Sequence, residues 1–215
     1  MTMPSRALPA LAAAVFLAGA SRAAALDWAI GVEGGYFDMT NAPKSAKAIF
    51  DGKTGGGTVG GFVHLGLGQS FFLEAHGRQF KRTGERVFVA DAGGEVFRLG
   101  HPLTIRLVPV YGAVGYRFGR GAHFAPYVTI GLGATSYKET SDVAGLVETQ
   151  STTKFSGHGA LGVDYLAGPL RFGVEVGYSM VPNTIGEAGV SKVYGEKDVG
   201  GLTVLARLAF GTRAP

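Results

Sequence analysis

The chain has 215 residues, no cysteine and a formal net charge of +4, and 46% of its residues are hydrophobic. This length fits a single domain, and the lack of cysteine excludes a disulfide scaffold, a thiolate metal site and a lipidated N-terminal cysteine. The 36 glycines follow no collagen-like period, and the apolar content is too high for a disordered chain, so these glycines belong to an ordered structure.

The N-terminus has the layout of a secretory signal peptide. A short segment with Arg6 precedes an apolar stretch that ends at Ala20, and small residues ending at Ala25 follow. The stretch is shorter than the roughly 20 residues of a spanning helix, which favours a signal peptide over a membrane anchor or a buried helix. Cleavage fits after Ala20 or after Ala25. We favour the second site, which gives a signal peptide of residues 1–25 and a mature domain of residues 26–215.

Beyond this segment a two-residue alternation recurs. No run of roughly 18 apolar residues is found there, which excludes a helical membrane protein. From Asp27 the chain alternates between an apolar face that begins at Trp28 and a second face that contains Glu33. Seven further segments alternate in the same way: 58–67, 71–81, 103–118, 126–137, 154–166, 170–181 and 199–210. Each is close to the roughly 9–11 residues that a tilted strand needs to cross a bilayer, and the fourth is long enough to project beyond it.

The connections between these segments alternate in length. Short turns at 66–69, 119–121 and 167–169 separate long connections, which is the rhythm of transmembrane barrels. In the second long connection, 86–90 and 95–98 also look extended on either side of a turn, which predicts a hairpin above the membrane. An even number of strands returns both ends of the chain to the periplasmic side. The sequence therefore predicts an all-β fold, an eight-stranded antiparallel up-and-down transmembrane β-barrel.

The two faces of the strands differ in chemistry. One is apolar, as at Val110 and Val114, and we assign it to lipid, with aromatic residues near the strand ends forming two girdles. The other carries charges that hydrocarbon would not tolerate, so we place it inward. An eight-stranded barrel is only just wide enough for its own side chains, so these charges should pair across the lumen, with inward glycines such as Gly31, Gly115 and Gly162 making room. The predicted lumen network consists of Glu33, Glu74, Arg78, Arg117, Asp164, Arg171, Glu175 and Arg207, and His64 and His76 share its face.

Alternation alone does not say which face of a barrel is inside. A soluble eight-stranded barrel with an apolar interior, of the lipocalin type, is therefore the alternative. It would leave the charged face in solvent and would make the rhythm of long and short connections accidental, so we favour insertion in a membrane.

Several short motifs resemble those of a known family. They are Val114–Phe118 (VGYRF), Pro126–Gly133 (PYVTIGLG), Gly162–Tyr165 (GVDY) and Leu208–Gly211 (LAFG). They look like small outer-membrane barrels of the OmpA, OmpX and OmpW type, and the resemblance spans nearly the whole mature chain. It implies the outer membrane of a Gram-negative bacterium. It also implies that Phe210 is the aromatic signal by which the barrel assembly machinery recognises the last strand, although residues 211–215 follow it here.

The sequence offers only weak candidates for a catalytic or metal-binding site. Ser156, His158 and Glu175 could mimic an acyl-transfer triad, but their spacing does not match a lipid A deacylase and they face inward, away from acyl chains. His64 and His76 lie on adjacent strands without a clear third metal ligand. We therefore assign no catalytic, metal or cofactor-binding residue and expect no enzyme and no cofactor.

The predicted function is a structural or interaction role in the outer membrane, with a charged, plugged lumen and extracellular loops. A narrow channel for small or apolar solutes is the alternative, and a lipid-modifying enzyme is the third reading. The expected partners are outer-membrane lipids, the barrel assembly machinery and an extracellular or envelope protein, which could add a strand to the hairpin edges near Phe88 and Phe97.

The net charge argues against a nucleic-acid partner. Loss of residues 1–25 lowers it from +4 to +2, and this excess of positive charge is too slight to indicate nucleic-acid binding.

Overall fold

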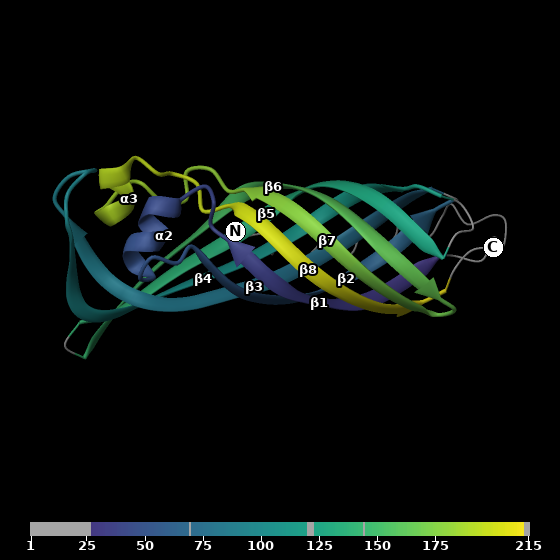
Figure 1. Cartoon of the computed structure of the whole chain (residues 1–215), viewed down its shortest axis with the longest axis horizontal. Helices are drawn as coiled ribbons and strands as arrows, with labels where there is room; N and C mark the ends of the chain where they lie inside the picture. The colour runs from purple at the N-terminus through teal and green to yellow at the C-terminus, as the bar shows by residue number, and fades with distance from the viewer. Residues whose placement is uncertain (1–26, 69, 120–122, 144, 213–215) are drawn as a thin grey trace, which may run out of the picture.

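The computed structural model describes residues 27–68, 70–119, 123–143 and 145–212. Within them eight strands form a closed ring, each antiparallel to its neighbours (Figure 1). The strands are β1 (Trp28–Asp38), β2 (Gly55–Leu67), β3 (Phe71–Val89), β4 (Val96–Arg117), β5 (Phe124–Val143), β6 (Leu146–Ala167), β7 (Leu170–Met180) and β8 (Gly201–Gly211). β1 closes the ring on β8, with Glu33 opposite Arg207. The predicted all-β, eight-stranded, antiparallel up-and-down barrel is confirmed.

The four middle strands are longer than the sequence pattern indicated. The predicted hairpin between the third and fourth strands is confirmed as a continuation of β3 and β4, with Phe88 opposite Phe97. The predicted long connection between 137 and 154 is wrong, because β5 continues to Val143 and β6 begins at Leu146. This part of the hairpin is rich in Ser, Thr and Glu. It rises above the apolar wall, where both faces meet water and no apolar alternation marks a strand.

The first and last long connections each contain a short helix that the sequence analysis did not predict. They are α2 (Pro43–Ile49) and α3 (Gly189–Tyr194), and they lie together at one end of the barrel (Figure 1). Glu196 joins the two connections, since its carboxylate accepts hydrogen bonds from the backbone N–H groups of Lys44 (2.9 Å) and Ser45 (2.8 Å) at the start of α2. Neither helix in the described residues is long and apolar enough to cross a membrane. The predicted signal peptide, residues 1–25, lies outside the described residues.

The outer wall of the barrel is apolar. Ile130, Leu161 and Val110 are 73%, 65% and 57% exposed. In β8 the alternation is complete, with buried and exposed residues in turn from Gly201 to Gly211. The charged residues at the same level point inward, so the apolar face is outward as predicted.

The interior has two halves of different chemistry. The half near the short turns contains the charged residues, as predicted. The half near α2 and α3 is an apolar core that the sequence analysis did not predict, and α2 contributes Ala46 and Ile49 to it. Its larger members are Phe37, Met39, Phe50, Phe80, Leu103, Ile105, Leu107, Tyr137, Val181 and Val199. The inner face of the barrel therefore changes from charged to apolar toward the end that carries the helices.

Candidate functional site

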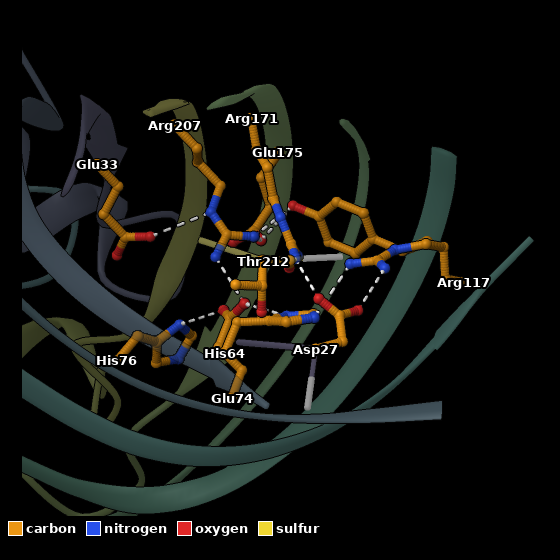
Figure 2. Close-up of polar contacts among 11 residues, drawn as sticks. Asp27, Glu33, His64, Glu74, His76, Arg117, Arg171, Glu175, Arg207 and Thr212 are labelled. Carbon is orange, nitrogen blue, oxygen red and sulfur yellow. Dashed lines mark hydrogen bonds and ion pairs between the residues drawn. The ribbon is translucent and has the colours of Figure 1, made fainter. Parts of the chain in front are cut away.

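Arg207 is the centre of the charged half of the lumen. It extends inward from β8, and its Nη2 lies 2.7 Å from Glu74 Oε2 on β3. Its Nη1 lies 2.8 Å from Glu175 Oε2 on β7 and donates to the Tyr127 hydroxyl on β5 at 2.5 Å. Its Nε lies 3.6 Å from Glu33 Oε2 on β1. One guanidinium thus contacts side chains from four other strands, as Figure 2 shows for the labelled residues.

Arg78 extends the same cluster along β3. Its Nε lies 3.4 Å from Glu33 Oε1, so Glu33 stands between two guanidinium groups. Its Nη2 lies 3.1 Å from His158 Nε2 on β6. Glu74 is flanked by two histidines, with His64 Nδ1 at 3.8 Å and His76 Nδ1 at 3.5 Å. Each of these buried charges thus lies beside a charged or polar partner.

A second cluster lies in the lumen at the end with the short turns and is centred on Asp27. Its carboxylate forms ion pairs with Arg171 and with Arg117, the latter at 3.4 Å. Arg117 Nη2 lies 3.1 Å from His64 Nε2, which links this cluster to the first. Arg171 also donates to the backbone carbonyl of Thr212 at 2.7 Å, so the cluster ties the last strand to the start of the first (Figure 2).

Seven of the eight predicted lumen residues join ion pairs in these clusters. The exception is Asp164, which lies on the inner face of β6 in the field of Arg207, Arg117 and Arg171. No ion pair within 4.0 Å joins Asp164 to another residue in the described part of the chain. What role the network has, structural or gating, stays a prediction.

The sequence analysis missed two members of the network. Asp27 continues the inward parity of Ala29 and Glu33 by one step, and that parity could have identified it. Tyr127 shares inward parity with Thr129, and that parity could have identified it as well. Its hydroxyl also donates to Glu175 at 2.9 Å.

Inward glycines make room for inward aromatic rings. A Cβ atom added to Gly115 would lie 2.1 Å from the Phe72 ring. A Cβ atom on Gly31 would lie 2.5 Å from the Phe62 ring, and that of Gly162 would lie 2.3 Å from the Tyr127 ring. The prediction that these glycines provide space inside the barrel is confirmed.

The three residues considered as an acyl-transfer triad do not contact one another. The Ser156 hydroxyl accepts a hydrogen bond from Thr135 at 3.0 Å, while His158 contacts Arg78. Glu175 is bound to Tyr127 and Arg207. In the described part of the chain no group of three or more His, Cys, Asp or Glu side chains is placed to hold a metal ion.

A cavity of about 460 Å³ opens at the helical end of the barrel. Its apolar wall includes Met39, Ile49 and Ile105, and its polar wall includes Glu139 and Lys154. A much smaller cavity of about 30 Å³ lies deeper, between the apolar and charged halves of the lumen. Such a volume holds roughly one or two water molecules.

A closed ring with a lipid-compatible outer wall and a paired, charged interior defines a small membrane β-barrel. The family model for the outer membrane protein beta-barrel domain matches residues 10–187, which is most of the chain. The chain belongs to this family, and it is an outer-membrane protein.

The solved structures that are similar to this one include two outer-membrane proteins. Neisserial surface protein A aligns with a TM-score of 0.53 and 13% identity, over 86% of this chain and 95% of that chain. A major outer membrane protein from Thermus thermophilus aligns with a TM-score of 0.55 and 13% identity, over 87% of this chain and 99% of that chain. Identity this low supports the fold alone. No curated protein sequence matches the chain.

Proposed function

We propose that this outer-membrane protein is a non-enzymatic barrel with a closed lumen, which acts by binding an extracellular or envelope partner through the part that rises above the membrane. The observation that carries the first half of the proposal is the position of Arg207. Contacts to side chains on β1, β3, β5 and β7 place its guanidinium across the lumen. Between this cluster and the wider cavity at the helical end, the lumen contains a space of only about 30 Å³.

The part above the membrane supports the second half of the proposal. β3 to β6 extend past the ends of the other four strands and present exposed apolar side chains, including Phe88 (57%) and Phe97 (50%). Arg86 on the first long hairpin pairs with Glu148 on the second at 3.1 Å, which holds the two hairpins together. A fixed surface with exposed aromatic residues and free strand edges is suited to protein recognition.

Solute uptake by proteoliposomes tests the closed lumen. Liposomes that contain the folded protein should swell in small sugars no faster than empty liposomes. Swelling that depends on the protein and falls with solute size would instead support the narrow channel. The heat-modifiable shift of the folded barrel on a gel controls for insertion.

Photo-crosslinking in intact cells tests the binding surface. A photo-reactive residue at Phe97 should give a protein adduct, whereas the same residue at Phe172, which is 47% exposed on the lipid-facing wall, should give none. Absence of an adduct at Phe97, or equal adducts at both positions, would contradict the proposal.

The absence of catalysis and the assembly signal are tested separately. Replacing Ser156 should leave the lipid A mass profile unchanged, because its hydroxyl is buried and bound to Thr135.

Phe210 is 54% exposed near the end of β8, with its ring 6.5 Å from that of Trp28. This position supports its proposed role as the signal for the assembly machinery, so Phe210→Ala should lower the amount of protein in the outer membrane.

A further inference from the structure

Three basic side chains lie side by side on the outer wall of the barrel. Lys81 on β3 pairs directly with Arg106 on β4, and Arg106 pairs directly with Lys138 on β5. All three are exposed and share the parity of the lipid-facing residues. Directly paired residues have Cβ atoms only about 5 Å apart, so these residues form one continuous row of positive charge.

Nothing in the described part of the chain neutralises this row. None of the three side chains forms an ion pair within 4.0 Å or a hydrogen bond with a described residue. Like charges directly opposite one another destabilise a sheet, so three in a row carry a cost that an external anion would remove. The other described strand cations lie inside the barrel, face the upper cavity or belong to the hairpin tip: Arg78, Arg82, Arg86, Arg98, Arg117, Lys154, Arg171 and Arg207.

The height of the row above the apolar wall indicates its surroundings. Val110, Ala134 and Phe155 pair across β4, β5 and β6 and form the upper edge of the apolar surface, where Phe155 is 68% exposed. Lys138 follows Ala134 by four residues on β5. At about 3.4 Å per residue and a strand tilt of about 40°, the row lies roughly 10 Å above that edge. This is the level of lipid headgroups rather than acyl chains.

Hydroxyl groups continue the surface above the row. Thr83, Thr104 and Thr140 pair in register one step further from the membrane, and the hydroxyls of Thr83 and Thr104 are 2.8 Å apart. Apolar residues below, cations in the middle and hydroxyls above match the order of acyl chains, phosphate and sugar in a phosphorylated glycolipid. Lysine and arginine bind phosphate through charge-assisted hydrogen bonds.

We propose that Lys81, Arg106 and Lys138 form a binding site for the phosphate groups of an outer-leaflet lipid headgroup, with the acyl chains on the apolar wall below. The site is on the outside of the barrel and is independent of whether the lumen conducts. It would hold the β3–β6 side of the barrel to the outer leaflet and so fix the height of the long hairpins above the membrane.

The test is native mass spectrometry of the folded protein titrated with bis-phosphorylated lipid A, dephosphorylated lipid A or inorganic pyrophosphate. The triple variant Lys81→Gln, Arg106→Gln, Lys138→Gln should bind bis-phosphorylated lipid A on the order of 100-fold more weakly, since each cation near a membrane surface contributes about fivefold. Binding of dephosphorylated lipid A should not change. The matched control Lys47→Gln, Lys53→Gln, Lys192→Gln removes the same charge from exposed positions in the first and last connections.

Three results would overturn the proposal. The triple variant could bind bis-phosphorylated lipid A as the wild type does, or the control variant could lose as much affinity. Pyrophosphate could bind as tightly as the lipid, which would make the row a site for free anions. If the triple variant fails to fold, the single variant Arg106→Gln serves in its place, with an expected loss of roughly fivefold.

Discussion

At the scale of single residues, the buried charges of the lumen lie beside charges of the opposite sign. Arg207 has only 4% of its side chain exposed, yet Glu33, Glu74 and Glu175 all lie within 3.6 Å of its guanidinium. The inward parity of these residues made the set predictable from the sequence. The particular pairs were not predictable. Parity shows which residues of a strand point inward, but it does not show at what level along the barrel axis each of them lies.

Arg207→Ala should destabilise the folded barrel by about 3–5 kcal/mol, because it leaves buried carboxylates without their central partner. Urea unfolding monitored by tryptophan fluorescence measures this change. Lys53→Gln is the control, since Lys53 is exposed in the first connection and its removal should change the free energy of unfolding by less than about 0.5 kcal/mol. Equal stability of the two variants would show that the lumen pairs are not needed.

Gly115→Ala should destabilise the barrel by about 1–3 kcal/mol, because the new methyl group meets the Phe72 ring at 2.1 Å. Gly112 on the same strand is a matched control, since an added Cβ atom there meets nothing within 4 Å. Folding yield and unfolding midpoint, measured in parallel, compare the two. A Gly112→Ala variant as unstable as Gly115→Ala would point to glycine flexibility instead of space for the ring.

At the scale of elements, the strands could be predicted because apolar, lipid-facing residues alternate with polar, lumen-facing residues along the sequence. That contrast ends above the membrane, which is why the sequence pattern predicts a loop where the structure has the upper part of the β5–β6 hairpin. The helices α2 and α3 have seven and six residues, too few for a helical period to emerge. The apolar core that α2 covers joins inward residues of the strands, such as Phe80, to residues of the first long connection, such as Met39 and Ile49. It was not predicted because that connection has no clear pattern.

Glu196→Ala should loosen α2 without unfolding the barrel. The change removes the acceptor for the N–H groups of Lys44 and Ser45, and losing such a cap costs about 1 kcal/mol. Hydrogen exchange should therefore speed up in residues 43–49 and stay unchanged in β1 and β8. Glu187→Ala, at an exposed position in the same connection, is the control and should leave the exchange of α2 as in the wild type.

At the scale of the whole molecule, the structure is a barrel with a charged lower lumen, an apolar upper core and an open cavity at the top. Arg207 joins strands across the lower lumen by ion pairs, and the upper half contains apolar residues such as Phe80 and Leu107. The number of strands and the orientation of their faces were predictable from the sequence. The upper core and its cavity were not, because both depend on how the connections fold back over the barrel.

Single-channel recording of the purified, heat-modifiable protein in a planar bilayer tests the closed lumen most directly. We expect a protein that inserts but gives no discrete openings, because in a closed lumen the ion pairs around Arg207 and the apolar core above them would block the path. Discrete and reproducible openings of the wild-type protein, altered in conductance by Arg117→Ala or Arg207→Ala, would contradict the closed lumen and make these charges part of a channel.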